Sequence, residues 1–298
     1  MLFIRTVKSN YSFFCTIAFL LFAITHDAMA MTGHDIMQLS QQRHNSYPYV
    51  YEEQTMVLED KFGHRSTKKM KRFSRFEKDK SAKLLLLFTY PEEVKGFSLI
   101  AHRDSSGNTT QSMYLPGLRP KPIQCGGKNS VPQFLGTDFS IESLIGENLD
   151  NYIYKNRKPK VLDGVMHYQV DVYDKNHEEK LLRQHFIRQD NLVITKTIYF
   201  DSQGKMDRMQ GFHDVNIVFE DAWQANHILM QDMKEQHQSL IKIERRIFSE
   251  DYVPEEVFTL EWLQNNFPYI EPINNLALEE NQFLPDLFEP NQVENDLQ

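Results

Sequence analysis

The feature that most constrains the fold is a long series of strand-like segments, in many of which apolar and polar residues alternate. Twelve such segments follow one another, at 49–59, 67–76, 82–90, 97–103, 111–115, 152–155, 167–173, 182–188, 192–200, 214–219, 226–233 and 239–248. Alternation with one apolar face is typical of an antiparallel sheet that is covered on one side. The pattern therefore predicts a mainly β fold built on one curved antiparallel sheet or open barrel.

Few helices interrupt the series. Residues 31–46 suit a short N-terminal helix that ends before Pro48, and 91–96 suits a tight turn or a single helical turn. Residues 136–146 suit a longer helix, which Thr137 or Asp138 can cap and Gly146 can close. Its apolar stripe consists of Ile141, Leu144 and Ile145.

The first thirty residues have the pattern of an export signal. Arg5 and Lys8 precede an apolar run at 12–24, and Ala28-Met29-Ala30 supplies the small residues of a cleavage site. An uncleaved membrane anchor is the alternative, but spanning a bilayer needs about 20 apolar residues. We expect cleavage after Ala30 and export of the chain, with one folded domain at 31–264 and an acidic, partly disordered tail at 265–298. Beyond Arg246 the chain has twelve acidic residues and no Lys or Arg.

No catalytic motif stands out. The chain lacks G-x-S-x-G, H-E-x-x-H, Walker A and G-x-G-x-x-G patterns, and its His residues are scattered. With two cysteines, Cys15 and Cys125, it has neither a disulfide framework nor a Cys-rich metal site. The net charge of −8 argues against binding of nucleic acid. We therefore expect a protein that is not an enzyme and uses no metal or cofactor.

A basic run stands out in this acidic protein. Between residues 65 and 83 there are nine Lys or Arg residues and two acids, a net charge of +7. One interpretation is a solvated strand face that balances the acidic tail. The other is a docking surface for anionic headgroups or an acidic partner, formed by Lys68, Lys69, Lys71, Arg72 and Arg75.

The strand at 82–90 is apolar on both faces. Leu84, Leu86 and Phe88 share one face, and Leu85 and Leu87 share the other. Both faces must therefore be covered. Two environments are compatible with this pattern: a central strand packed under a helix, or a wall of a hydrophobic cavity.

Three segments carry a resemblance to a known family. They are FTYPEEVKGFSL at 88–99, MYLPGLR at 113–119 and FLGTDFSIESL at 134–144. In order and spacing they resemble the LolA-like outer-membrane lipoprotein-sorting family, in its longer subgroup associated with RND-type exporters, over roughly residues 49–263. One departure is Pro120-Lys121-Pro122, where two prolines weaken the strand that usually follows.

The resemblance implies an open antiparallel half-barrel with a short helical lid over a hydrophobic cavity for acyl chains. The residues expected to form the cavity and lid are Leu84, Leu86, Phe88, Phe97, Leu99, Phe139, Ile141, Leu144 and Ile145. It also implies a periplasmic carrier, a monomer, for acyl chains of a lipoprotein or free lipid moving between the inner and outer membranes. The alternatives are a non-carrying accessory subunit of an inner-membrane RND-type exporter and an enzyme of unrecognised type.

Overall fold

The computed structural model describes residues 31–44, 47–114, 121–122, 136–140, 143–144 and 146–266. It divides the chain into a unit at 1–31 and a unit at 32–298, and the fold described below is that of the second unit. The predicted signal peptide, Cys125, Ile141, Ile145 and most of the predicted tail lie outside the described residues.

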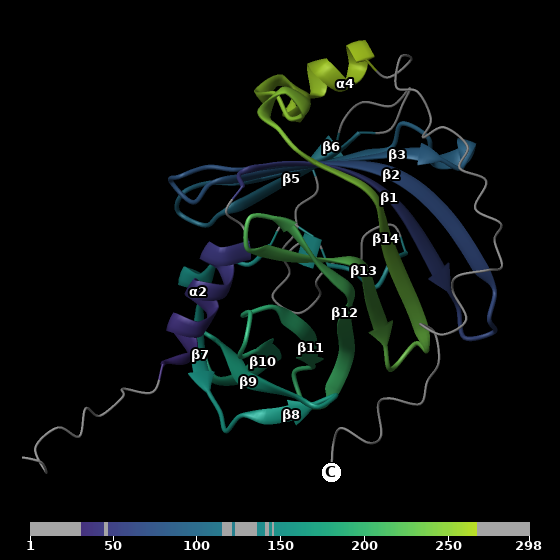
Figure 1. Cartoon of the computed structure of the whole chain (residues 1–298). Coiled ribbons are helices and arrows are strands. Elements are labelled where there is room, and N and C mark those ends of the chain that lie inside the picture. The colour runs from purple at the N-terminus through teal and green to yellow at the C-terminus, as the bar shows by residue number, and fades with distance from the viewer. Residues whose placement is uncertain are drawn as a thin grey trace, which may run out of the picture. The chain divides into compact units, whose positions relative to one another are not determined.

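One antiparallel sheet makes up most of the described chain (Figure 1). Its 14 strands in the described residues are β1 Tyr49–Glu59, β2 Arg65–Phe76, β3 Ala82–Tyr90, β4 Ser98–Arg103, β5 Thr109–Tyr114, β6 Lys121–Pro122, β7 Tyr152–Asn156, β8 Lys160–Leu162, β9 Val165–Asp174, β10 His177–Arg188, β11 Ile194–Phe200, β12 Met206–Phe219, β13 Ala222–Asp232 and β14 His237–Phe248. Their order is β6-β5-β4-β3-β2-β1-β14-β13-β12-β11-β10-β9-β7, with β8 paired to β9. The sheet is not closed, so the predicted mainly β, open antiparallel fold is confirmed.

Neighbours in the chain are mostly neighbours in the sheet. One exception is β1, which pairs with both β2 and β14 and so joins the first strands of the sheet to the last, and another is β7, which pairs with β9. The predicted weakening around Pro122 corresponds to β6, an edge strand of only two residues. Proline is tolerated there because an edge strand needs no second hydrogen-bonding partner.

Helix α2, Gly33–His44, begins with a capping box. Thr32 Oγ1 accepts the Asp35 N–H at 3.1 Å, and Asp35 Oδ2 accepts the Thr32 N–H at 3.0 Å. The helix buries Ile36 and Met37. Gly33 permits a close approach to β7, because a Cβ at this position would lie 2.8 Å from the Tyr154 backbone.

The other helical elements are short. They are η1 Glu92–Val94, η2 Leu149–Asn151, η3 Glu250–Tyr252, η4 Glu255–Phe258 and α4 Leu260–Asn266. In the part of the chain that the structure describes, no helix has the length and apolar character needed to cross a membrane.

Both faces of β3 are covered, as its sequence predicts. On the inner face, Leu84, Leu86 and Phe88 pack in a cluster that includes β1, β4, β13 and β14 residues as well as Phe139 and Leu144. On the outer face, Leu85 and Leu87 pack against the segment that follows β14, through Val253, Val257 and Leu263. Figure 1 shows this C-terminal segment, with α4, on the outer side of the first strands.

Candidate functional site

A cavity of about 350 Å³ lies between α2, the inner face of the sheet and the described residues between 139 and 149. Part of its wall is apolar, with Val50, Phe139, Leu144, Phe212, Ile228 and Ile241. Another part is polar and charged, with Glu52, Gln54, Arg72, Arg103, Glu147 and Arg246. The volume is within the range of about 300–1,000 Å³ typical of small-molecule sites.

The predicted cavity residues divide between this wall and the closed core. Phe139 and Leu144 line the cavity. The other five described residues do not line the cavity. They pack in the inner cluster, which also contains Phe139 and Leu144, and they are Leu84, Leu86, Phe88, Phe97 and Leu99. The apolar run on β3 therefore forms solid core, and the cavity lies toward α2 and β12–β14.

The lid segment begins its helical turn later than predicted. Ser140 Oγ accepts the Ser143 N–H at 3.1 Å, and Ser140 O accepts the Leu144 N–H at 3.2 Å. Ser140 therefore caps this turn, and the expectation of a cap at Thr137 or Asp138 is wrong.

Asp138 instead attaches the start of the segment to β14. Its Oδ2 accepts the Ser239 hydroxyl at 2.6 Å and lies 2.7 Å from His237 Nδ1, while its N–H donates to Ser239 Oγ at 3.0 Å. Burial raises the pKa of Asp138, although the Ser239 and His237 contacts oppose that rise. Side-chain bonds at this point fix the segment over the sheet.

A buried charge cluster forms the floor of the cavity, at the centre of the sheet. Glu52 on β1 accepts Arg246 Nε of β14 at 2.6 Å, Arg72 Nη1 of β2 at 3.1 Å and Gln54 Nε2 at 2.7 Å. The Glu52, Arg72 and Arg246 side chains are 4%, 17% and 9% exposed. Burial alone would raise the pKa of Glu52, but the two guanidinium groups outweigh it and hold the pKa below its usual value.

Two arginines of the sheet also donate hydrogen bonds to backbone carbonyl groups of the lid segment. Arg72 Nη2 donates to Leu144 O at 3.1 Å, and Arg103 Nη1 donates to Gly146 O at 2.7 Å. Helix ends leave backbone carbonyls without partners in the helix, so these guanidinium groups satisfy them. The arginines therefore connect the sheet to the lid across the cavity.

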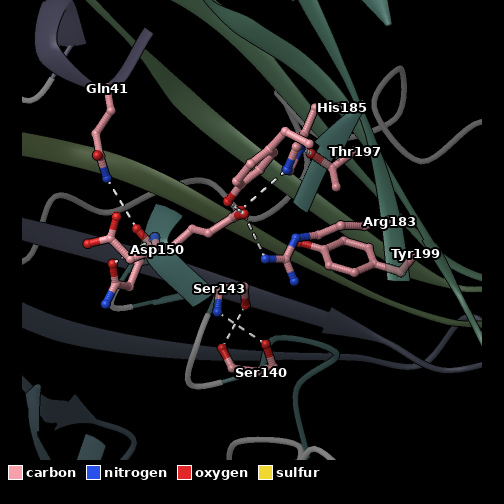
Figure 2. A network of polar contacts seen from close by, with 12 residues as sticks. Gln41, Ser140, Ser143, Asp150, Arg183, His185, Thr197 and Tyr199 are labelled. Atoms are coloured by element: carbon pink, nitrogen blue, oxygen red, sulfur yellow. Dashed lines mark hydrogen bonds and ion pairs between the residues drawn. The ribbon is translucent and has the colours of Figure 1, made fainter. Parts of the chain in front are cut away.

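A second buried carboxylate, Glu147, follows the lid directly. Its carboxylate forms an ion pair with Arg183 Nη2 at 2.9 Å, lies 3.3 Å from His185 Nε2 and accepts a hydrogen bond from the Tyr154 hydroxyl. Figure 2 shows Arg183 and His185 of this network, and His185 Nδ1 lies 2.9 Å from Thr197 Oγ1. Burial would raise the pKa of Glu147, but Arg183 and His185 outweigh it and hold the pKa well below its usual range.

The five residues predicted to form a docking surface are not brought together. Alternation along β2 places Lys68 and Arg72 on the face of Met70, which is in the inner cluster, and the other three on the face of Phe73. Arg72 belongs to the cavity floor. On the opposite face, Arg75 is paired within the molecule with Glu77, Glu250 and Glu255 at 2.5–3.3 Å. Lys69 and Lys71 remain together on that face.

Sequence reasoning missed the charged floor, although one signal was present. In β1 the inward positions read Val50, Glu52, Gln54, Met56 and Leu58, so two polar residues interrupt an apolar face. A charged residue at such a position needs a buried partner. The partners themselves come from strands distant in sequence. Among the described residues, no group of three or more His, Cys, Asp or Glu side chains could hold a metal ion.

Comparison with known proteins gives a family and a fold. A family model with the description "-like: Uncharacterized protein" matches residues 80–265, more than half of the chain. No curated protein sequence matches the chain.

Several solved structures are similar. An outer membrane lipoprotein-sorting protein domain, so named, from Vibrio parahaemolyticus has a TM-score of 0.71 at 21% identity, over 78% of this chain and 98% of that one. A DUF1329 family protein from Desulfovibrio piger has a TM-score of 0.67 at 20% identity, over 76% and 98%. A LolA superfamily protein from Nitrosomonas europaea has a TM-score of 0.63 at 12% identity, over 78% and 100%.

At these identities the structures establish the fold, and the family model establishes membership. The chain therefore belongs to the family of that model and has the fold of LolA-like, outer-membrane lipoprotein-sorting proteins.

Proposed function

We propose that the protein is a periplasmic carrier that shields acyl chains of a lipoprotein or a free lipid between the inner and outer membranes. The observation that carries this proposal is the cavity of about 350 Å³ under the 139–149 segment of a LolA-like fold. The apolar part of its wall suits a hydrocarbon chain.

The size of the cavity is sufficient for useful binding. A water molecule takes about 30 Å³ of liquid volume and a methylene group is of similar size, so the cavity holds on the order of twelve methylene groups. Each buried methylene contributes about 0.8 kcal/mol, which gives on the order of 10 kcal/mol before the costs of ordering. The hydrophobic effect can supply this binding without any catalytic group.

Periplasmic location is part of the proposal and depends on the pattern of residues 1–30, with cleavage between Ala30 and Met31. N-terminal sequencing of the exported protein tests it. A chain that still starts at Met1 in the membrane fraction would contradict it.

Native mass spectrometry of protein isolated from a periplasmic extract of its own host tests the carrier function. We expect a monomer with lipid-sized mass additions that disappear after organic extraction. An accessory subunit of an RND-type exporter would instead retain a partner protein and no lipid, and that result would overturn the carrier proposal.

A further inference from the structure

The charge cluster in the cavity floor is not neutral. Glu52 contributes one negative charge, whereas Arg72 and Arg246 contribute one positive charge each, so the cluster has a net charge of +1. All three side chains are mostly buried, and all three line the cavity. Because the three side chains are mostly buried, their charges are screened less than charges at an exposed surface would be.

The remaining described carboxylate of the cavity wall does not offset this charge. Glu52 and Glu147 are the only carboxylates among the described lining residues. Glu147 already has Arg183 at 2.9 Å and His185 at 3.3 Å. Arg103 adds a further guanidinium to the same wall, bonded to the lid at Gly146 O. The cavity therefore has a positive floor beneath apolar sides.

An occupant that suits these walls has an anionic end and an apolar chain. Buried charges are stable in proteins when they are paired, and guanidinium groups pair well with carboxylate and phosphate oxygens. The volume, on the order of twelve methylene groups, suits one chain rather than several.

We infer that the cavity binds a single-chain amphiphile with a carboxylate or phosphate end, and that this end lies against Glu52, Arg72 and Arg246. This inference rests on the proposed carrier function and adds the chemistry of the cargo. A neutral amphiphile of the same length is expected to bind more weakly, because it brings no negative charge to offset the net charge of the floor.

Displacement of the fluorescent apolar probe 1-N-phenylnaphthylamine from the purified protein tests the inference. The competitors are dodecanoate, dodecyl phosphate, methyl dodecanoate and dodecyltrimethylammonium, all below their micellar concentrations. We expect at least one of the two anions to bind about tenfold or more tightly than the ester, since one charge-assisted contact is worth that ratio. The two anions are compared with each other to decide between carboxylate and phosphate.

Two variants, one that removes the net charge of the floor and one that restores it, test whether this charge causes the preference for anions. Arg246→Gln leaves Glu52 paired with Arg72 and makes the floor neutral, so the preference for the anion should fall at least fivefold while ester binding is retained. The double variant Glu52→Gln/Arg246→Gln restores a net charge of +1 through Arg72, so it should restore the preference. Thermal melting of both variants checks that they are folded. If Arg246→Gln does not fold, the inference is tested by the preference of the wild type for anions over the ester and by whether the double variant keeps that preference.

The outcomes separate the inference from the function on which it rests. Equal binding of anions and ester by the wild type, or an unchanged preference in Arg246→Gln, overturns the inference and leaves the carrier intact. Failure of the wild type to bind the probe and every competitor overturns the carrier function itself.

Discussion

At the scale of single residues, the cavity depends on two buried glutamates that are held ionised by arginine. Glu52 joins three strands at the centre of the sheet, and Glu147 joins the end of the lid to β10 through Arg183 and His185. In both glutamates, the neighbouring basic side chains together lower the pKa of the carboxyl by more than burial raises it. A carboxyl with a lowered pKa stabilises the fold above its ordinary pKa and loses that stabilisation as the pH falls toward its value in the fold.

The pH dependence of stability therefore gives a prediction for Glu147. We expect the free energy of unfolding to fall as the pH drops below about 4.5, the ordinary pKa of a glutamate. In Glu147→Gln this fall should be shallower than in the wild type, and stability at pH 7 should be lower by about 3–5 kcal/mol, because Arg183 loses its carboxylate. Urea unfolding at pH 7, 5 and 3 measures both effects.

The matched control is Glu92→Gln, since the Glu92 side chain is 83% exposed. It should follow the wild type at every pH. The interpretation of Glu147 would be contradicted if Glu147→Gln had the stability and pH dependence of this control.

At the scale of elements, the outer face of β3 depends on the segment after β14. Leu85 and Leu87 would be open to water without Val253, Val257 and Leu263. Ion pairs of Arg75 with Glu250 and Glu255 add to this contact. The first part of the acidic C-terminal region is therefore a structural cover of the sheet.

Substitution of Leu263 tests this cover. Leu263 on α4 is fully buried, so Leu263→Ala should cost about 2–5 kcal/mol through lost burial and the cavity left behind. Glu261→Ala, on an exposed position of the same helix, should change stability by less than about 0.5 kcal/mol. Equal effects of the two substitutions in denaturant unfolding would show that α4 does not stabilise the sheet.

The elements also show what could be read from the sequence. The predicted bounds of β1 and β3 match the structure, since both have dense apolar and β-branched or aromatic residues between clear turn signals. The three-residue β8 and the short α4 were missed, because such brief elements contain too few residues to show a period. The Ser140 cap was missed because Thr137 and Asp138, a few residues earlier, are equally good capping residues.

The site was less predictable than the elements. Phe139 and Leu144 could be identified as cavity residues because they lie in a recognisable lid segment. Arg246 could not, because it meets Glu52 only through the pairing of β1 with β14, 194 positions apart in the sequence. A regular strand pattern does not state which distant strand will be its neighbour.

At the scale of the whole molecule, the described domain is an open sheet with its outer face partly covered by the C-terminal segment. A lid on the inner side lies over a cavity with a charged floor. The fold is that of LolA-like proteins. We propose that the apolar cargo binds in this cavity.

A series of alkanoates of increasing chain length tests whether the cavity is the binding site. Alkanoates of 8 to 18 carbons are titrated against bound 1-N-phenylnaphthylamine, with the wild type and with Ile228→Trp, which enlarges a side chain in the cavity wall. In the wild type we predict that affinity rises with length and levels off near about 12 carbons, the capacity of the cavity. Ile228→Trp should level off about two carbons earlier and remain folded. The same length dependence in both proteins, or affinity that continues to rise through 18 carbons, would show that the chains bind elsewhere.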